Sequence, residues 1–371
     1  MEKVISINAT HIIFISDIHF GIKQNSEEWQ ENQKKYFYNF FLPEVKAIKR
    51  MIGPNERLIC INLGDTFHDR QAIDINVNNM AIDIFTEIGK EVETYIMNGN
   101  HDLSRKTNQG NTSIRSLEGI PGVHIIKDPT LLNINYGSGT KSLILIPYLG
   151  SVEKENEMLI KYSGKTDCAL MHTVITKMKM DNGSTITDGI NQDIYSGFIM
   201  SGHIHRRQET KKVLYIGSPY HLTKSDIGDM KGLYFANVGK WEIKFIPNTI
   251  SPIYQTIPFE TFSKLNETEK TQLLENNYTG IIINEEDIPK IKKKFDIYNL
   301  GNGIAAKSVK PVINKQKLTI EIKEDIPEDQ TFYDLIKSSI LELDIQDDEK
   351  ERLVGLSAAY LTQAEQEIAN D

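Results

Sequence analysis

The sequence predicts a layered α/β domain, built from two sheets or from one large sheet, over residues 1–247. Two observations support this class. Short apolar runs alternate along the chain with segments of helical periodicity, and the runs are continuous rather than a strict alternation of apolar and polar residues. Continuous runs are typical of strands whose two faces are both covered by other elements.

Seven apolar runs are expected to be buried strands, and two more are expected to form a hairpin. The buried strands are predicted at residues 11–16, 57–62, 93–98, 142–148, 168–172, 197–202 and 213–218. The hairpin joins residues 232–238 to residues 241–247 through a short turn at Gly239-Lys240. Helical periodicity covers residues 77–90 and residues 27–50, where Pro43 should interrupt the helix.

The character of the sequence changes after Pro247. Residues 279–311 have the pattern of a strand, a helix and a second strand; residues 317–323 add a further strand, and residues 324–330 resemble a linker. Two helices are predicted to close the chain, with apolar faces made of Phe332, Leu335, Ile336 and Ile340 in the first and of Leu353, Leu356 and Tyr360 in the second. We therefore expect domains at residues 1–247, 248–323 and 324–371.

The formal net charge of −9 is concentrated at the end of the chain. Residues 321–371 contain 15 Asp and Glu against 4 Lys and Arg, which leaves residues 1–320 with 38 basic and 36 acidic residues. The body of the protein is therefore close to neutral. Residues 103–117 and 206–224 are locally basic, which suits contact with a polyanion and also suits ordinary solvated loops.

Neither a membrane segment nor a secretion signal is expected. No apolar run approaches the roughly 20 residues that a membrane-spanning helix needs, and the first residues do not resemble a signal peptide. The two cysteines, Cys60 and Cys168, lie in apolar runs. We expect buried free thiols in a reducing cytoplasm, with a disulfide as the alternative.

Six of the nine histidines follow the ends of predicted strands, together with other polar residues. Ligand sites in α/β sheets gather at the carboxyl ends of strands because the loops converge there. We assign no function to His11, His124 and His221. The clusters are Asp17 with His19, Asp65 with His68, Asn100 with His101 and Asp102, His172, and His203 with His205.

The residue types and their spacing favour a metal site. Residues two apart on an extended segment point to the same face, so Asp17 with His19, and His203 with His205, could each reach one pocket. Oxygen and imidazole ligands without cysteine suit Mn²⁺, Mg²⁺, Fe²⁺ or Zn²⁺. Seven candidate ligands are too many for one ion, and a carboxylate such as Asp65 could lie between two ions about 3.5–4 Å apart.

Each cluster alone has an ordinary structural explanation. A single histidine after a strand is usually structural, and the Asn, Asp and Gly residues of the sequence NGNHD all suit turns. The combination of five such clusters favours a functional site.

The ordered motifs DIHFG, GDTFHDR, GNHD, a later histidine and GHIH resemble the signature of the calcineurin-like metallophosphoesterases. Two details resemble the SbcD-type repair nucleases, the group that includes the meiotic recombination eleven nuclease and small phage subunits. These details are His68, three residues after Asp65, and the segment GSPYHLTKSD after the last motif. The resemblance implies a β-sandwich flanked by helices, a small α+β capping domain that binds DNA, and a C-terminal helical segment.

The resemblance also implies a set of metal ligands. Two divalent ions are expected, Mn²⁺ or alternatively Mg²⁺, with Asp65 shared between them. His172 is followed by Thr-Val-Ile rather than by a glycine-rich loop, which departs from the family's pattern. The implied ligands are Asp17, His19, Asp65 and His205 for the first ion, and Asp65, Asn100, His172 and His203 for the second.

Further roles follow from the same resemblance. His101 matches the catalytic histidine of the family, and His68 matches the residue that places the DNA end or its phosphate. Asp102 is expected to accept a hydrogen bond from a histidine and so fix its tautomer, or else to serve as a turn residue or helix cap. The basic residues beside the motifs are expected to follow the DNA backbone, namely Arg70, Arg105, Lys106, Arg206 and Arg207.

The implied activity is metal-dependent hydrolysis of DNA, as a 3′–5′ double-strand exonuclease and a single-strand endonuclease in double-strand-break repair and recombination. The implied partners are DNA, a second copy of the chain, and an SMC-like ATPase of the SbcC type that binds the C-terminal helices. Those helices could instead pack onto their own domain. The expected location is the cytoplasm, of the host if a phage encodes the protein. The competing functions are a metallophosphatase or cyclic-nucleotide phosphodiesterase acting on small substrates, and a non-catalytic scaffold.

Overall fold

The computed structural model describes residues 3–104, 111–284 and 306–314, together with residues 337, 340, 341, 350–355 and 357. The chain divides into two compact units. Residues 1–283 and 287–313 form the first, and residues 284–286 and 314–371 form the second. Within the described part of the chain, every helix is too short or too polar to cross a lipid bilayer.

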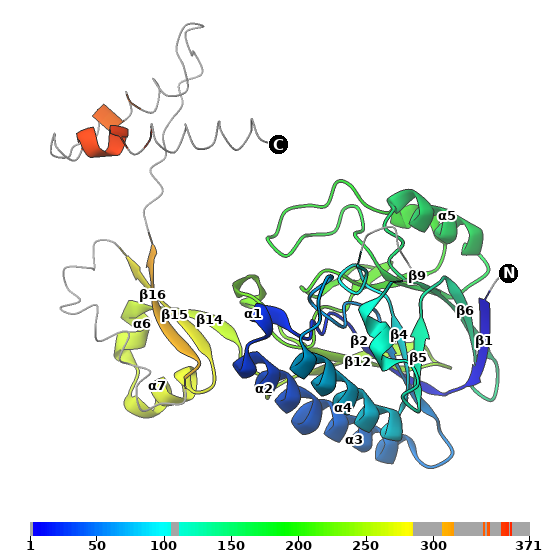
Figure 1. The fold of residues 1–371 in the computed structure, drawn as a ribbon. Coiled ribbons are helices and arrows are strands. Elements are labelled where there is room, and N and C mark those ends of the chain that lie inside the picture. Colours follow the sequence, from blue (N-terminus) through cyan, green and yellow to red (C-terminus); the bar gives the residue numbers. More distant parts are fainter. Residues whose placement is uncertain are drawn as a thin grey trace, which may run out of the picture. The chain divides into compact units, whose positions relative to one another are not determined.

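Two large sheets make up most of the first unit (Figure 1). Seven strands form one sheet in the order β1 (Lys3–Asn8), β6 (Thr130–Asn135), β7 (Thr140–Ile146), β8 (Cys168–His172), β9 (Phe198–Gly202), β11 (Val213–Tyr215) and β10 (Gln208–Glu209). Six strands form the other in the order β13 (Glu242–Pro247), β12 (Gly232–Asn237), β2 (His11–Ile15), β3 (Leu58–Asn62), β4 (Glu93–Met97) and β5 (Val123–Ile126).

Alternate residues of one strand contribute to two different apolar cores. In β2, Ile12 and Phe14 pack in a core shared with strands of the seven-stranded sheet, whereas Ile13 and Ile15 pack in a core shared with helices. Successive side chains of a strand point to opposite faces, so both faces of this sheet are buried. This explains the continuous apolar run, and it confirms the predicted sandwich flanked by helices.

Helices cover the outer faces of both sheets. Three long helical segments lie side by side over the six-stranded sheet (Figure 1), namely α2 (Glu27–Tyr36), α3 (Leu42–Ile52) and α4 (Ile75–Glu91). Another helix, α5 (Val152–Tyr162), packs on the seven-stranded sheet. The remaining short segments are the helix α1 (Ile22–Asn25) and the 3-10 turns η2 (Ser113–Leu117), η3 (Gln192–Ile194) and η4 (Lys224–Asp226).

Pro43 does not end the helix that was expected over residues 27–50. The π-helical segment η1 (Phe37–Phe41) joins α2 directly to α3, and Pro43 lies in the first turn of α3. A proline in a first turn has a fixed φ that suits the helix, and its missing N–H is tolerated there. The predicted interruption is therefore a widened turn rather than a break.

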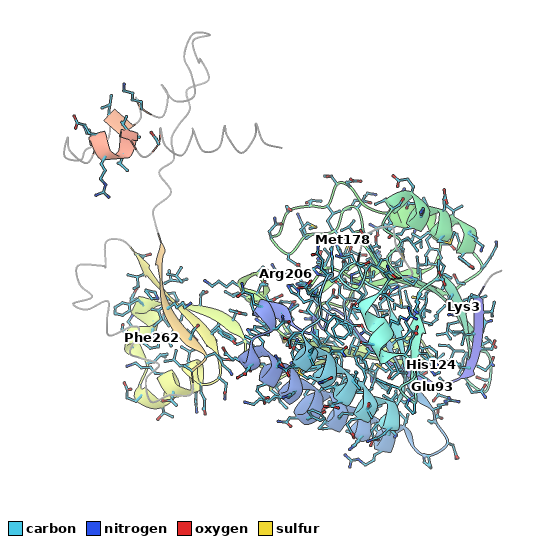
Figure 2. The ribbon with its side chains drawn as sticks, viewed as in Figure 1. Lys3, Glu93, His124, Met178, Arg206 and Phe262 are labelled. Carbon is cyan, nitrogen blue, oxygen red and sulfur yellow. The ribbon has the colours of Figure 1, made fainter. Side chains whose placement is uncertain are left out.

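A third, smaller sheet follows Pro247. Its strands are β14 (Tyr254–Pro258), β15 (Tyr278–Asn284) and β16 (Ser308–Asn314), and its helices are α6 (Phe259–Lys264) and α7 (Glu267–Leu274). It has a core of its own, to which Phe262 contributes (Figure 2). The two strands predicted within residues 279–311 are therefore confirmed.

Other predictions for this part of the chain lie outside the described residues. They are the helix between the strands, the strand at residues 317–323, the linker at residues 324–330 and most of the two closing helices. Residues 350–355 are helical, in agreement with the second closing helix. The domain boundaries at residues 247 and 323 remain predictions. Both cysteines are buried and unpaired, as expected.

Candidate metal centre

The ends of five strands bring the predicted site residues together. Strands β2, β3 and β4 run parallel in one sheet, and β8 and β9 run parallel in the other. Loops at the carboxyl ends of parallel strands therefore meet. Asp17 and His19 follow β2, Asp65 and His68 follow β3, Asn100, His101 and Asp102 follow β4, His172 ends β8, and His203 and His205 follow β9.

Two groups of side chains that contain a carboxylate could each hold a metal ion, and a third group, His19, His68 and His101, contains none. Asp17, His19 and His205 form one group, and Asp65, His172 and His203 form the other. Within each group the ligand atoms lie within 4.8 Å of one another. We refer to them as the His205 group and the His172 group.

Asn100 adds an oxygen to the His172 group. Its Oδ1 lies 3.0 Å from His172 Nε2 and 2.7 Å from His203 Nδ1. The structure brings together the residues of the two expected ligand sets, and their binding of metal remains a prediction.

The Asp65 carboxylate lies between the two groups. Its Oδ2 is 3.3 Å from His172 Nε2 and 3.5 Å from His19 Nε2. Both histidines are buried, and so is Asp65. A carboxylate in this position can contact ions in both groups, as expected of a shared ligand.

The donor set around His172 fits a cation. His172 Nδ1 lies 2.9 Å from the Leu63 carbonyl, so this nitrogen carries the proton of a neutral ring. The lone pair of Nε2 then faces two oxygens, Asp65 Oδ2 and Asn100 Oδ1. Burial lowers the pKa of His172, but the Asp65 carboxylate outweighs burial and raises the pKa to about 9. Positive charge is therefore favoured at this point, from a proton or from a metal ion.

The His205 group presents a neutral imidazole at His19. His19 Nε2 and His205 Nε2 lie 3.1 Å apart, and His19 is almost fully buried. Burial holds the pKa of His19 well below its usual range, so its ring is uncharged and can act as a ligand. This second donor set, two imidazoles and the Asp17 carboxylate, also suits a divalent metal.

Several candidate ligands have a strained backbone. The φ angles are 55° for Asp17, 51° for His19, 52° for Asp65 and 86° for His203. Residues other than glycine rarely adopt such positive values, which cost about 1–3 kcal/mol each. Such strain persists only where the surrounding structure enforces it, and it is concentrated in functional sites.

A glycine allows the loops after β3 and β4 to approach each other closely. A Cβ atom on Gly99 would lie 2.1 Å from Asp65 Oδ1 and 2.2 Å from the Asp65 nitrogen. His101 N–H also donates to Asp65 Oδ1 at 2.8 Å. The glycine in GNHD is therefore required by close packing against Asp65.

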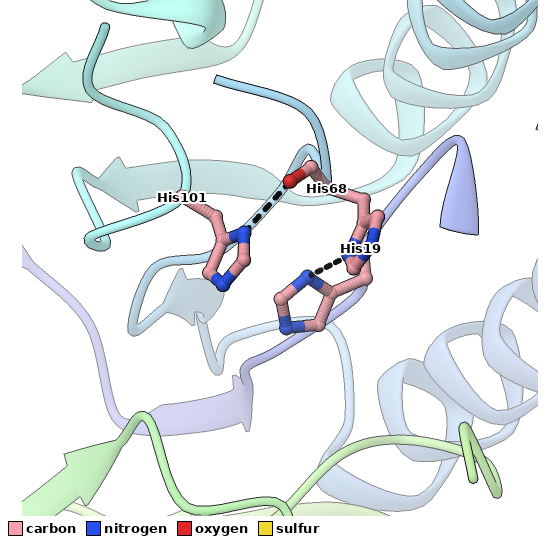
Figure 3. A group of neighbouring side chains, drawn as sticks. All are labelled: His19, His68 and His101. Atoms are coloured by element: carbon pink, nitrogen blue, oxygen red, sulfur yellow. Dashed lines mark hydrogen bonds between the residues drawn. The ribbon is translucent and has the colours of Figure 1, made fainter. Parts of the chain in front are cut away.

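His19 and two histidines beside the ligand groups, His68 and His101, are arranged by mutual contacts (Figure 3). His101 Nδ1 lies 2.7 Å from the His68 carbonyl, and His68 Nδ1 lies 3.2 Å from His19 Nδ1. The His68 and His101 rings are nearly parallel, with centroids 5.3 Å apart. Because Nδ1 of His101 donates to a carbonyl, its Nε2 remains for proton transfer to or from another molecule.

Asp102 differs from its predicted role. Its carboxylate accepts hydrogen bonds from the backbone N–H groups of Gly99 at 2.8 Å, Phe67 at 3.0 Å and Thr66 at 3.2 Å, rather than from a histidine. Burial raises the pKa of Asp102 to about 6. The side chain therefore ties the loop after β4 to the loop after β3. Backbone carbonyls, of Leu63 and His68, orient the histidines instead.

The predicted DNA-binding residues have different environments. Arg70 lines a cavity of about 260 Å³ together with Arg115. The Arg206 side chain is half-exposed, and its backbone N–H donates to Asp181 at 3.0 Å (Figure 2). Arg105 and Lys106 lie outside the described residues.

Arg207 has structural contacts instead of a free charge. Its guanidinium carbon lies 3.8 Å from the centroid of the Phe245 ring, and its Nε lies 2.7 Å from the Met230 carbonyl and 3.6 Å from Asp229. A guanidinium held in this way is poorly placed to follow a DNA backbone, so we do not retain Arg207 in the DNA-binding set.

Sequence reasoning missed several residues that support the site. Gln33 donates to the His19 carbonyl at 3.0 Å, and Lys231 donates to the His205 carbonyl at 2.6 Å. Asp181 Oδ2 lies 3.7 Å from His205 Nδ1. Gln33 and Asp181 lie outside the motifs, and Lys231 follows GSPYHLTKSD; no spacing rule connects them to the histidines. The unassigned His124 pairs with Glu93 at 2.8 Å, away from the cluster (Figure 2).

Comparison with known proteins shows one family and viral relatives. Residues 10–207 match the family model described as calcineurin-like phosphoesterase. The chain is 26% identical over 299 residues to "Exonuclease subunit 1" of Enterobacteria phage T4, covering 76% of this chain and 81% of the relative. It is 28% identical over 216 residues to "Putative phosphoesterase 244L" of Invertebrate iridescent virus 6, covering 56% of this chain and 69% of the relative.

A solved structure was also matched. It is the nuclease MPE of Pseudomonas putida, which is 12% identical, with coverage of 64% of this chain and 87% of that chain. The TM-score is 0.26, which is too low to indicate a shared fold.

Proposed function

Because this chain belongs to the calcineurin-like phosphoesterase family, we propose that it is a two-metal-dependent DNA nuclease that hydrolyses phosphodiester bonds. The similarity to the phage T4 exonuclease subunit supports DNA as the substrate, since it covers 76% of the chain and so extends beyond residues 10–207. A small-molecule phosphatase would have no evident use for the additional sheet after Pro247.

The observation that carries the proposal is the position of Asp65. One buried carboxylate lies within 3.5 Å of a histidine from each ligand group. Two bound divalent ions would neutralise the phosphate and lower the pKa of a coordinated water, which is the chemistry that a diester anion requires. We propose that the His205 group and the His172 group, with Asn100, hold these ions, and that Mn²⁺ is the metal used.

The remaining histidines would act on the substrate directly. His101, oriented by the His68 carbonyl, would donate a proton from Nε2 to the leaving 3′ oxygen or stabilise its developing charge. His68, half-buried and nearly parallel to His101, would place the DNA end or its phosphate. Arg70 and Arg206 would contact flanking phosphates, where each cation should add to the salt dependence of binding.

We extend the proposal to the whole chain. Residues 248–323 would form a DNA-binding capping domain, and residues 324–371 would bind an SMC-like ATPase of the SbcC type. The assembly would be a homodimeric nuclease with 3′–5′ exonuclease and single-strand endonuclease activity in cytoplasmic break repair and recombination. The name of the T4 relative, a subunit of an exonuclease, supports a multi-subunit assembly.

A three-substrate assay tests the activity. Purified protein is incubated with labelled linear DNA, bis-p-nitrophenyl phosphate or p-nitrophenyl phosphate, each with and without Mn²⁺. We expect Mn²⁺-dependent cleavage of DNA and of the diester, and little cleavage of the monoester. An Asp65→Asn variant purified in the same way should lose the activity, which excludes a contaminating nuclease.

Other outcomes would favour the competing functions. Rapid cleavage of the monoester with intact DNA would identify a phosphatase. Inactivity toward all three substrates would favour a non-catalytic scaffold.

A further inference from the structure

One segment contacts the backbone of His205 and of Ile18, the residue before His19. It comprises residues 218–231, which begin within the sequence GSPYHLTKSD and end at the start of β12; we refer to it as the 218–231 segment. None of its side chains belongs to either ligand group. Its contacts with the site are therefore made through backbone carbonyls of the ligand loops.

Lys231 fixes the backbone of His205. The side chain is only 3% exposed, and its Nζ lies 2.6 Å from the His205 carbonyl. The same ammonium lies 2.6 Å from Asp226 and 3.0 Å from Asp229. An ammonium group has three N–H donors, and here it meets three acceptors. The Ser218 N–H also donates to the His205 carbonyl at 3.0 Å.

Tyr220 and Gln33 make the corresponding contacts at His19. The Tyr220 hydroxyl donates to the Ile18 carbonyl at 2.5 Å and lies 3.0 Å from Gln33 Nε2. Gln33 Nε2 in turn donates to the His19 carbonyl at 3.0 Å. Both Tyr220 and Gln33 are buried. This network supports a loop in which His19 has a strained φ of 51°.

The His172 group is supported by other residues. His172 Nδ1 lies against the Leu63 carbonyl, and the His203 N–H donates to Asp17. Their described hydrogen bonds run to Leu63, Asn100 and Asp17, and none of these residues belongs to the 218–231 segment. The 218–231 segment therefore contacts only the His205 group, although Asp65 lies between the two groups and Asp17 of the His205 group accepts a hydrogen bond from the His203 N–H.

We propose that Lys231 is a positioning residue for the His205 group, assisted by Tyr220 at His19. By fixing the carbonyls of His205 and Ile18, the 218–231 segment holds the two imidazoles of this group at the separation that one divalent ion requires. Ligand-orienting contacts outside the coordination shell commonly change metal affinity, and here the effect should be confined to one of the two ions. The inference rests on the two-ion site of the proposed function.

The experiment measures binding of Mn²⁺ alone to the full chain. Calorimetry gives the affinity of each ion, and electron paramagnetic resonance shows whether two Mn²⁺ ions are magnetically coupled. The variants are Lys231→Met and Tyr220→Phe. The matched control is Lys177→Met, because Lys177 is an exposed lysine paired with Asp193 at 2.9 Å. Circular dichroism and thermal unfolding report on folding.

We expect the affinity for one ion to fall about 10- to 100-fold in Lys231→Met, with the affinity for the other unchanged. The coupled spectrum should then disappear at Mn²⁺ concentrations that produce it in the wild type and in the control. Tyr220→Phe should weaken binding of the same ion, since the substitution removes the hydroxyl and keeps the buried ring. A purely structural role for Lys231 would lower thermal stability without this selectivity.

Unchanged binding of both ions, equal weakening of both, or a wild type without a coupled pair would each overturn the proposal. Lys231→Met removes the ammonium beside Asp226 and leaves Asp229 with Arg207 alone; if the variant does not fold, Tyr220→Phe alone decides by the same criteria. The readout needs no DNA. A chain that shows the selective loss but cleaves no DNA would contradict the proposed nuclease function and leave the positioning role intact.

Discussion

His101 is placed for proton transfer by a backbone atom rather than by an acidic side chain. Its Nδ1 contacts the His68 carbonyl, and it is not a member of the His205 or His172 group. A role in proton transfer predicts that its loss affects the reaction without affecting metal binding.

We therefore predict that His101→Asn keeps Mn²⁺ affinity at the wild-type level while kcat for DNA cleavage falls about 100- to 10,000-fold, the usual contribution of general acid catalysis. His124→Asn is the matched control, because His124 pairs with Glu93 outside the cluster. Steady-state cleavage of labelled DNA and Mn²⁺ titration check the prediction. Cleavage at the wild-type rate would remove His101 from the mechanism.

Gly99 is a second residue whose substitution has a definite consequence. A Cβ at this position would overlap Asp65, both at Oδ1 and at the backbone nitrogen. Because Asp65 contacts both groups, we predict that Gly99→Ala lowers the affinity for each of the two Mn²⁺ ions about tenfold or more. Gly355→Ala is the control, since a Cβ there meets nothing within 4 Å. Calorimetric affinities equal to those of the wild type would contradict this prediction and show that the loop after β4 can move away from Asp65.

For individual residues, the sequence predicted which side chains gather at the site better than it predicted the groups that hydrogen-bond to them. The proximity of Asp17, His19, Asp65, Asn100, His203 and His205 was predictable because each follows a strand in a recognisable motif, and His172 ends a strand without such a motif. The partners of Asp102 and His101 were not predictable, because they are backbone groups that every residue possesses. The contact between the Arg207 guanidinium and the Phe245 ring could not be predicted either, since Phe245 lies far away in the sequence.

At the scale of elements, the contact between the 218–231 segment and β14 depends on a neutral histidine. His221 Nδ1 accepts a hydrogen bond from the Tyr254 N–H at 3.1 Å, and His221 Nε2 donates to the Asp229 carbonyl at 2.9 Å. Burial, together with the charge of Lys231, lowers the pKa of His221. Protonation of Nδ1 would remove the acceptor that holds the first strand of the small sheet.

This arrangement predicts a pH-dependent stability. The unfolded chain takes up the proton at a pKa of about 6.5, whereas the folded chain takes it up only at lower pH. The contribution of His221 is therefore fully present above pH 6.5 and is lost as the pH falls toward the folded pKa, at no more than about 1.4 kcal/mol per pH unit.

Urea unfolding of the metal-free protein between pH 8 and pH 5 measures this effect. The free energy of unfolding of the wild type should fall more steeply with acid than that of His221→Asn, which keeps an acceptor but does not titrate. Parallel pH profiles for the two proteins would contradict the assignment.

The strands that carry the site were predicted because they are buried on both faces. Strands β2, β3, β4, β8 and β9, which carry the site, have continuous apolar runs, and their observed bounds agree with the predictions within about two residues. Strands β1 and β6 were missed. They pair with each other at an edge of the seven-stranded sheet, where alternate residues are more exposed and the apolar signal is weaker.

Across the whole chain, the C-terminal residues 321–371 differ in net charge from residues 1–320. Residues 321–371 carry 11 more acidic than basic residues, whereas residues 1–320 carry two more basic than acidic residues. A segment with this charge is repelled by DNA, which supports the proposal that it binds a protein partner rather than the substrate.

We predict that removing residues 325–371 abolishes binding to the SMC-like ATPase and leaves Mn²⁺-dependent DNA hydrolysis at the wild-type rate. All candidate ligands lie in the first unit, which ends at residue 313. Co-purification with the ATPase checks the loss of binding, and the cleavage assay checks the retained hydrolysis. Loss of hydrolysis or of thermal stability would instead indicate that the tail packs onto its own domain.

The proposed reaction depends on one carboxylate, Asp65, serving two metal ions. The most direct test is the number and affinity of Mn²⁺ ions bound per chain in the wild type, in Asp65→Ala and in His172→Ala. We predict two ions in the wild type, weaker binding of both in Asp65→Ala, and weaker binding of one in His172→Ala. A single ion in the wild type, or an Asp65→Ala variant that weakens only one of two ions, would contradict the claim.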